Sequence, residues 1–423
     1  MNTALWKTKN RGKLNLCKSK HILVLNDCKL DNSKVNDFAG FNTQMLIKNF
    51  DSGHIIYFID LIREKGIKYT ETQIVNTIRE KNISIVFFAP NGSNYELSIE
   101  FFKRLRDKSK VKTALWVLDD ELIFDVLTKY YAQVFDAAVT CDYYATFAYQ
   151  KLNIPALYFF SNFSKKDFYP INMDKDIDVS FVGDCTKVDR MKYITYLKTK
   201  DIKIVTYGNG SKNGFVSKRD LPKIFSRSKI NLNFTKIDKV EPFAWFLEDN
   251  TLTNIIRQNK GRPMELALTN SFCLSEYSPS LDVTFTIGKD VDMFYNKEDL
   301  YEKILFYLGH DALRVEMANN AYKKAVTLYE ADIFMPGLLE KLCGILDNHL
   351  YLKREQIIYK DSIFKKNHLI RLTTMMVFQL SKFKFRPAFE TFSNLFQYGF
   401  GIFCISFCKG IKLSLVKAFY RKM

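Results

Sequence analysis

Short apolar runs alternate with amphipathic stretches along the first 160 residues of the chain. The apolar runs are strand-like and lie at 21–26, 83–90, 112–120, 136–141 and 155–160. The stretches between them, at 70–81, 93–107 and 142–153, carry apolar residues at helical spacing. Most of the runs are continuous rather than alternating, which is typical of strands buried on both faces. The pattern therefore predicts a parallel, doubly wound sheet.

The same alternation restarts after a polar segment. Residues 161–177 carry Pro170 and several Asp and Lys residues, and we interpret them as a linker. Further strands are predicted at 178–184, 202–210, 229–234, 270–277 and near 282–287. Helices are predicted near 187–200, 218–228, 262–269, 297–309, 311–329 and 332–350. We therefore expect an α/β protein with two Rossmann-like, doubly wound domains, 1–165 and 178–350, that face a cleft.

The C-terminal tail, 351–423, has a different pattern. No charged residue occurs from Thr391 to Cys408, and five phenylalanines share one helical face at 392, 396, 400, 403 and 407. The run is short for a membrane-spanning helix and contains polar residues, so an amphipathic helix lying on a membrane is favoured over a spanning one. A helix that packs against the rest of the protein stays an alternative.

Charge is concentrated at the two ends of the chain. Residues 1–20 carry six basic side chains and no acid, and 351–423 carry 14 Lys and Arg against three acids. These two segments account for the whole net charge of +17, which leaves 21–350 neutral. A nucleic-acid-binding protein would carry its basic residues on the folded body, so we expect no nucleic acid partner. An anionic membrane surface met by the tail fits better, and we expect a cytoplasmic protein peripheral to the inner face of the cell membrane.

Two further absences narrow the class of protein. No apolar run precedes His21, so no signal peptide is expected. The eight cysteines include no Cys-x-x-Cys pair and no Cys/His cluster with zinc spacing, so no metal site is expected.

The most specific segment of the chain is KGRPMELALTNSFCLSEYSP, at 260–279. It resembles the donor-binding segment of the glycosyltransferases related to the CgeB family of spore-maturation proteins. Arg262, Glu265, a helix through Thr269, a turn at 270–271 and a strand that ends at 276–277 follow one another in the order of that family. The resemblance extends over about 178–335 and identifies the chain with group 1 glycosyltransferases of the GT-B type.

The resemblance implies an activity and its substrates. A glycosyltransferase of this type, in the hexosyltransferase class, moves a sugar from a nucleotide-diphosphate-sugar, a co-substrate rather than a cofactor, and generally holds no metal. The acceptor would be a saccharide, a lipid-linked molecule or a protein, in surface glycan synthesis. The helix at 332–350 would cross back to the first domain.

The predicted donor site follows from what a diphosphate and a ribose need. Phosphates bind backbone N–H groups at helix N-termini and fixed cations, and a carboxylate can accept from two ribose hydroxyls. The candidate phosphate cations are Lys260 and Arg262, and Glu265 is the candidate ribose ligand. The remaining candidate donor ligands are Gly183, Arg190, Gly208, Thr269, Asn270, Ser271 and Glu276.

Each of these assignments has a simpler alternative. Arg262 and Glu265 stand three residues apart on a predicted helix and could be an ion pair. Gly183 and Gly208 could be ordinary turn residues, and Glu276 a surface acid or helix cap. Many retaining GT-B enzymes carry a glutamate eight residues before the ribose ligand, where this chain has Arg257. The stereochemistry of transfer therefore stays open.

Two acids are the candidate catalytic residues on the acceptor side. Asp119 and Asp120 follow a predicted strand, and ligands of open α/β sheets bind at the carboxyl ends of strands. They are interpreted as acceptor ligands or a general base, with an N-cap as the alternative. Two competing functions stay open: a non-catalytic GT-B-fold binding or structural protein, and a GT-B nucleotide-sugar epimerase.

Overall fold

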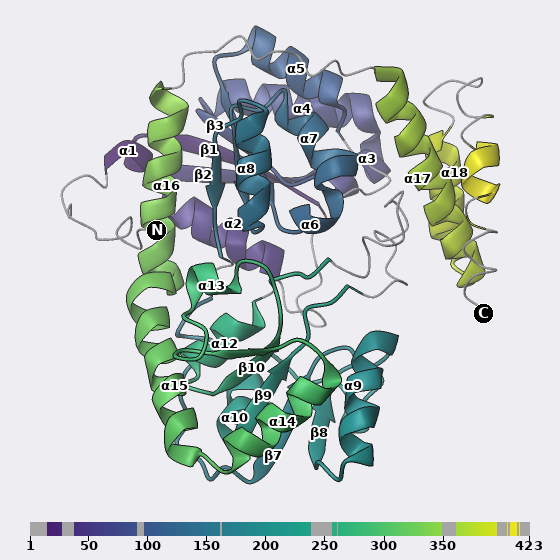
Figure 1. The fold of residues 1–423 in the computed structure, drawn as a ribbon. Coiled ribbons are helices and arrows are strands. Elements are labelled where there is room, and N and C mark those ends of the chain that lie inside the picture. Colours follow the sequence, from purple (N-terminus) through teal and green to yellow (C-terminus); the bar gives the residue numbers. More distant parts are fainter. Residues whose placement is uncertain are drawn as a thin grey trace.

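The computed structural model describes residues 15–27, 38–90, 97–160, 163–237, 256–259, 261–348, 361–395, 404, 407–412 and 414. It contains two parallel β-sheets, each with helices on both faces (Figure 1). A column of successive helical segments runs along one side of both domains, and two further helices lie beside the first domain (Figure 1). The α/β fold with two doubly wound domains is thereby confirmed.

Among the described residues, the first sheet has six parallel strands. In spatial order they are β2 (Ser52–Tyr57), β1 (His21–Asn26), β3 (Ile85–Phe88), β4 (Lys112–Val117), β5 (Ala137–Thr140) and β6 (Ala156–Tyr158). The helices that accompany it are α1 (Asn15–Lys18), α2 (Phe38–Lys48), α3 (Phe58–Lys65), α4 (Ile67–Glu80), α5 (Ile99–Lys108), α6 (Asp120–Ile123), the π-helix η2 (Phe124–Thr128), α7 (Lys129–Ala132) and α8 (Tyr143–Lys151). β2 was not predicted, because this edge strand is only half-buried and lacks a continuous apolar run.

Successive residues of each central strand point to opposite faces of this sheet. Leu23 and Leu25 join the core that includes α3 to α8, whereas Ile22 and Val24 join the core on the other side. Each face therefore needs its own layer of helices. This requirement explains the continuous apolar strands seen in the sequence.

The second sheet has five parallel strands within the described residues. Their spatial order is β11 (Asp292–Phe294), β10 (Cys273–Glu276), β9 (Ser228–Asn233), β7 (Ile177–Val182) and β8 (Ile204–Tyr207). The helices of this part of the chain are α9 (Val188–Thr199), α10 (Leu221–Arg227), α12 (Arg262–Leu268), α13 (Leu281–Thr284), α14 (Lys297–Leu308), α15 (Asp311–Lys324) and the π-helix η4 (Ala325–Tyr329). The strand predicted near 282–287 is wrong: its first residues form α13, with Leu281 and Phe285 buried in the core of the second domain.

In both sheets the strand order reverses beside the first strand of the domain. The chain winds outward from β1 to β2 and returns to β3 on the other side, and β7, β8 and β9 repeat this arrangement. Crossovers that leave in opposite directions open a crevice at the carboxyl ends of the two central strands. In the second domain this switch point lies between the ends of β7 and β9.

Helix α16 (Ala331–Asn348) returns to the first domain, as expected. Its buried face, which includes Met335, Leu338 and Leu342, packs with strands β1, β3, β4 and β5 in one core. The predicted linker is packed in its first part, since Phe163 and Phe168 are buried in the core of the second domain, whereas residues 172–176 are exposed. Phe163 pairs with Glu330, so the two crossings between the domains lie side by side.

The tail forms two helices, α17 (Asp361–Ser381) and α18 (Phe385–Leu395), that pack against each other. The helical tail expected from the sequence is therefore present. Across the part of the chain that the structure describes, no helix has both the length and the apolar character needed to cross a membrane.

Gly208 fixes the contact between the ends of β7 and β8. Its φ angle is +110°, and a Cβ atom there would lie 2.1 Å from the carbonyl oxygen of Gly183. We expect Gly208→Ala to lower the free energy of unfolding by more than about 3 kcal/mol, since strain and a backbone clash act together. Gly214→Ala is the matched control: its φ is +67° but the space around it is open, so its cost should be about 1–2 kcal/mol. Equal losses in urea unfolding would contradict this account.

Candidate functional site

The carboxyl edges of the two sheets face each other at the junction of the domains. Asp119 follows β4 of the first sheet, and its Oδ1 accepts a 2.9 Å hydrogen bond from the Gln258 side chain of the second domain. Tyr144 follows β5, and partial burial together with the nearby Asp282 and Tyr277 raises the pKa of its hydroxyl. Because Tyr277 follows β10, the two sheets meet end to end.

Two arginines reach the carboxyl end of β7, at the switch point of the second sheet. Arg262, the first residue of α12, donates to the carbonyl oxygen of Val182 at 3.2 Å. Arg190, in the first turn of α9, lies 3.4 Å from the carbonyl oxygen of Asp184. Each guanidinium also covers an aromatic ring, Phe225 and Phe181 respectively. The arginines are thereby oriented toward one point at the edge of the sheet.

Arg262 and Glu265 form the ion pair that the sequence left as an alternative. The pair is only partly exposed, and burial raises the pKa of the Glu265 carboxyl, while the charges of Arg262 and Lys218 offset part of this effect. An ion pair with one carboxylate does not use all the donors of a guanidinium, which has five. Arg262 therefore keeps donors with which it can bind a phosphate.

The two glycines of the predicted site act through packing. The Gly183 N–H donates to Tyr207 at 2.9 Å, and the Gly208 N–H donates to Gly214. These amides complete the contact between β7 and the turn after β8, so the expectation that Gly183 offers its own N–H to a phosphate is not supported. The side chains of Arg190 and Arg262 are donors that the structure describes at this edge. Lys260 lies outside the described residues.

The turn at Thr269, Asn270 and Ser271 is at the opposite edge of the second sheet. It follows the C-terminus of α12, whereas the donor candidates lie at the N-terminus of that helix. Its side chains bond within the turn and to α15, where Asn270 donates to Asn319 at 2.9 Å. The assignment of these three residues to the phosphates is therefore corrected: they are near the donor candidates in sequence but separated from them by the length of the helix.

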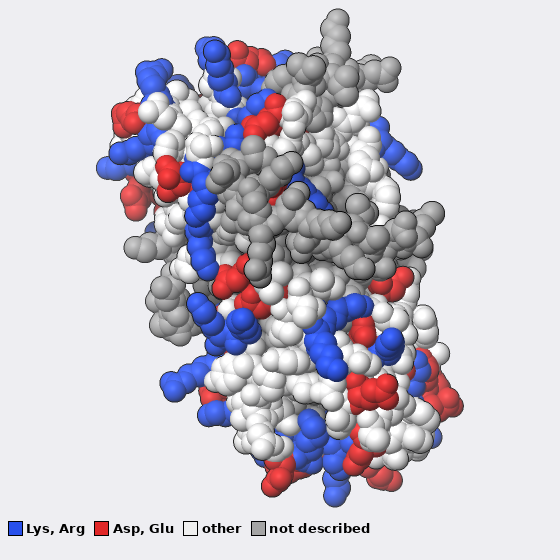
Figure 2. Space-filling view, turned by 90° about the vertical axis from the view of Figure 1, so that its left-hand side faces the viewer, with Lys and Arg blue, Asp and Glu red and all other residues white. Residues whose placement is uncertain are grey.

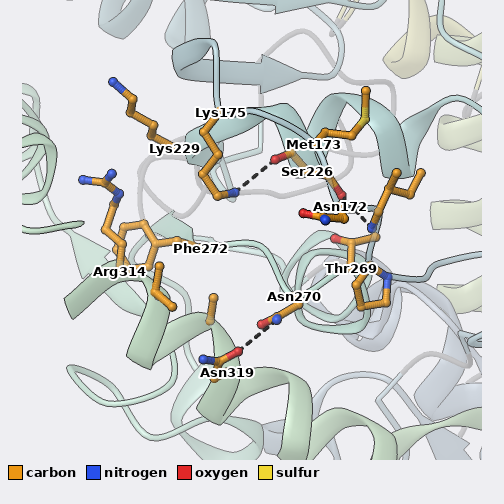
Figure 3. A pocket seen from close by; sticks show the side chains of 14 residues that line it. Asn172, Met173, Lys175, Ser226, Lys229, Thr269, Asn270, Phe272, Arg314 and Asn319 are labelled. Carbon is orange, nitrogen blue, oxygen red and sulfur yellow. Dashed lines mark hydrogen bonds between the residues drawn. The ribbon is translucent and has the colours of Figure 1, made fainter. Parts of the chain in front are cut away.

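A cavity of about 410 Å³ marks this opposite edge (Figure 3). Thr269 and Asn270 line it together with Lys175, Lys229 and Arg314, which come from the segments before β7 and within β9 and α15. Lys175 donates to the carbonyl oxygens of Ser226 and Ser228 here. The cavity thus belongs to the amino ends of the strands and not to the junction between the domains.

Glu276 holds the loop that follows β9. The side chain is only 2% exposed, and its Oε2 accepts from the backbone N–H groups of Thr235 at 2.8 Å and Lys236 at 2.9 Å. Its other oxygen lies 3.4 Å from Arg257 Nε. The structure gives this carboxylate a positioning role, and its predicted contact with the donor is not supported. Arg257 stands eight residues before Glu265, at the position where many retaining GT-B enzymes carry a glutamate.

Asp120 is a buried structural residue. It is 1% exposed and accepts hydrogen bonds from Thr128 at 2.5 Å and from Tyr149 at 3.0 Å. Burial raises the pKa of its carboxyl to about 7, although these bonds offset part of the effect. A side chain enclosed in this way cannot reach an acceptor, so its predicted catalytic role is corrected. Asp119 remains at the junction, bonded to Gln258.

Sequence analysis missed several residues at the junction. Burial and the charges of Asp142, Asp119 and Asp120 raise the pKa of the Glu121 carboxyl well above its ordinary range. Tyr277 and Tyr295, after β10 and β11, stack with ring centroids 5.4 Å apart and are exposed. Glu121 could have been found from the sequence, because it directly follows the two predicted acids. The tyrosine pair could not, because it depends on the pairing of β10 with β11, which one sequence does not reveal.

The junction is also bridged by a segment of the second domain. Ile237 and Ile256 pack in the core of the first domain, and Lys236 pairs with Arg257 in an antiparallel bridge. No group of three potential metal ligands occurs among the described side chains. The expectations of no metal and no cofactor stay predictions.

Comparison with known proteins finds a similarity within the second domain. Residues 189–333 match the family model described as glycosyl transferase-like. The match runs from α9 to the start of α16 and includes Arg190, Arg262 and Glu265. No curated protein matches the chain by sequence.

Solved structures confirm the GT-B architecture expected for a glycosyltransferase. HepE from Anabaena, in complex with UDP-glucose, has a TM-score of 0.55 at 9% identity, over 77% of this chain and 100% of that one. A glycosyltransferase from Rickettsia africae gives 0.55 at 11% identity, over 78% and 100%. Sucrose-phosphate synthase from Thermosynechococcus elongatus gives 0.53 at 9%, over 76% and 98%. At these identities the similarity concerns the fold. The narrower resemblance to CgeB relatives stays a prediction.

The surface of the folded body shows no excess of one charge on the face displayed in Figure 2. Blue and red side chains are interspersed over both domains there. This distribution agrees with the neutral charge of 21–350 and gives no basic stripe for a nucleic acid on that face.

The burial of Asp120 predicts a pH dependence of stability. Its pKa is about 7 in the folded protein, against an ordinary value near 3.8, so the folded state holds a proton that the unfolded chain has released between these values. The stabilisation that this proton gives to the folded state is complete below about pH 4 and is lost as the pH rises through about 7. We expect Asp120→Asn to remove it and to flatten the free energy of unfolding between about pH 5 and 7.5, a change of up to about 3 kcal/mol.

Asp125→Asn is the control for this experiment, since the Asp125 side chain is 80% exposed in the same segment. Urea unfolding at several pH values measures the effect. A wild-type protein whose stability does not fall toward neutral pH, or an Asp120→Asn protein with an unchanged slope, would contradict the burial argument.

Proposed function

We propose that the protein is a glycosyltransferase that binds a nucleoside-diphosphate sugar at the carboxyl edge of the second sheet. The observation that carries the proposal is the convergence of Arg190 and Arg262 on the end of β7, in a domain that matches the glycosyl transferase-like family model. Guanidinium groups suit the diphosphate because they can donate two parallel hydrogen bonds to its oxygens. Glu265, beside Arg262, is the proposed ribose ligand.

Binding of the donor would rearrange the Arg262–Glu265 pair. The phosphates would compete with the Glu265 carboxylate for the guanidinium, and the ribose hydroxyls would replace the guanidinium as donors to the carboxylate. The raised pKa of Glu265 reflects its burial, and hydrogen bonds from hydroxyls would compensate that burial. The ion pair is thus the resting form of the proposed ligand set.

The acceptor side of the reaction is proposed for the first domain. Asp119 and Glu121 follow β4, and Asp119 accepts a hydrogen bond from Gln258 of the second domain. A carboxylate at this edge can accept a proton from an acceptor hydroxyl. We therefore add Glu121 to Asp119 as a candidate base in place of Asp120. The proposed acceptor is a saccharide or a lipid-linked saccharide in surface glycan synthesis.

The location of the reaction is proposed from the tail. Its excess of basic residues would hold the enzyme at the inner, cytoplasmic face of the cell membrane, close to a lipid-linked acceptor. The donor would come from solution and the acceptor from the membrane.

The donor assignment is tested by Glu265→Gln. The amide keeps the size of the side chain but loses the charge that accepts from two hydroxyls, so we expect the Kd for UDP, measured by calorimetry, to rise about tenfold or more. Arg262→Lys should weaken UDP similarly, because an ammonium cannot bind a phosphate in a bidentate way. Arg227→Lys is the matched control, since Arg227 pairs with Asp176 at the end of α10, on the opposite edge.

A thermal melt of each variant separates loss of binding from loss of the fold. If Glu265→Gln and Arg262→Lys proteins melt normally and bind UDP as tightly as the wild type, the donor site lies elsewhere. Release of UDP from UDP-glucose, with and without saccharide acceptors, tests the activity. Tight binding without any turnover over a panel of nucleotide-sugars would favour the non-catalytic alternative.

A further inference from the structure

The two tail helices form a hairpin with its own small core. Leu369, Leu372 and Met376 of α17 pack with Ala388 and Leu395 of α18, and all five are buried. Thr391 also donates to the Gln379 side chain at 2.9 Å. The apolar faces of the two helices therefore pack against each other. An apolar side chain that is exposed on the hairpin is not needed to complete this core.

The tip of the hairpin is aromatic and exposed. Phe383 lies in the turn and Phe385 and Phe389 in the first turns of α18, with 81%, 66% and 73% of their surfaces accessible. Phe383 also has a φ angle of +56°, a backbone conformation that a bulky side chain rarely adopts. The chain thus holds three large apolar rings in water and accepts a strained backbone at one of them.

Basic side chains alternate with these rings. Lys382, Lys384 and Arg386 are all exposed, and the segment 382–389 contains no acidic residue. Rings flanked by cations match the boundary of an anionic bilayer, where the rings enter the acyl region and the cations meet the phosphates. A protein partner would need an apolar pocket ringed by acids, whereas a bilayer offers both chemistries everywhere on its surface.

We infer that the tip of the α17–α18 hairpin, Phe383, Phe385 and Phe389 with Lys382, Lys384 and Arg386, is a docking surface for an anionic lipid bilayer. The inference deepens the proposed membrane attachment, and it relocates the contact. The sequence pointed to the phenylalanine face at 392–407, but Phe392 and Phe407 pack against the hairpin core. Phe396, Phe400 and Phe403 lie outside the described residues.

The position of the hairpin fits an acceptor delivered by the membrane. In the view of Figure 1 the hairpin stands level with the first domain, and the second domain lies below it. A bilayer docked on the hairpin would therefore lie on the side of the proposed acceptor domain in this view.

Vesicle co-sedimentation of the full-length protein tests the inference. Vesicles of phosphatidylcholine mixed with phosphatidylglycerol should sediment the wild type, and pure phosphatidylcholine should sediment it less. The triple variant Phe383→Ser, Phe385→Ser, Phe389→Ser should bind the mixed vesicles at least about tenfold more weakly, because it loses three rings that enter the bilayer. Lys382→Glu, Lys384→Glu, Arg386→Glu should lose binding most strongly at low salt.

Each variant has a matched control. Phe215→Ser removes a ring that is 71% exposed on the second domain and is compared with Phe383→Ser alone. Lys198→Glu, Lys289→Glu, Lys323→Glu changes three exposed lysines of the second domain and gives the same net charge as the basic triple variant. Both controls should sediment with the mixed vesicles like the wild type.

Three results would overturn the inference. One is a wild type that ignores anionic vesicles, and another is a phenylalanine variant, with a normal circular dichroism spectrum, that binds them as the wild type does. The third is a wild-type dimer in light scattering that becomes monomeric in this variant, which would make the tip a contact between two copies of the chain. UDP binding is measured on the same proteins, so failure of the donor site and failure of the lipid surface are read separately.

Discussion

Two crossings of the chain between the domains are tied together at one buried carboxylate. Glu330 is 1% exposed, and its oxygens accept from the backbone N–H groups of Lys165 on the first crossing and Asp332 on the second. The Ala331 N–H adds a 3.0 Å bond to the carbonyl oxygen of Phe163. Because both connections are fixed at this point, the carboxyl edges of the sheets are held opposite each other, and the proposed donor and acceptor residues depend on that alignment.

The proposed donor side of this alignment uses side chains rather than a loop of backbone amides. The glycines after β7 and β8 use their N–H groups to join the two strands, which leaves the guanidinium groups of Arg190 and Arg262 as the polar groups directed at the edge. Glu276 and Arg257 then set the position of the neighbouring loop. Burial, and not residue type, thus separates the charged side chains that we propose as donor ligands from those that hold a loop in place.

Much of the fold was predictable because its strands are buried on both faces. The central strands β1, β3 and β4 are apolar runs that a single sequence reveals, whereas β7 and β9 alternate apolar with polar residues over part of their length. The helices between the strands follow the 3.6-residue period. β2 was not predicted, because an edge strand needs less apolar surface. The segment at 282–287 was wrongly predicted as a strand, because its apolar residues alternate with polar ones.

The candidate site was less predictable, because proximity in sequence is not proximity in the fold. Arg262 and Thr269 belong to one motif, yet a helix that crosses the sheet carries them to opposite edges. Asp119 and Asp120 are adjacent, yet one lies at the junction and the other is enclosed by Thr128 and Tyr149. The direction of a side chain depends on tertiary packing, which the residue pattern alone does not contain.

The sharing of cores between the domains has a consequence for modularity. α16 supplies one layer of the first domain although it follows the second in the chain, and Ile237 and Ile256 enter the first core from within the second domain. Chimeras that exchange whole domains between glycosyltransferases by cutting once, near residue 165, would strip the first domain of these pieces. A workable graft would have to keep the segments around 237 and 256, and α16, with the acceptor half. Recombination by simple exchange of halves is thus disfavoured for this chain, and its two domains are constrained to diverge together.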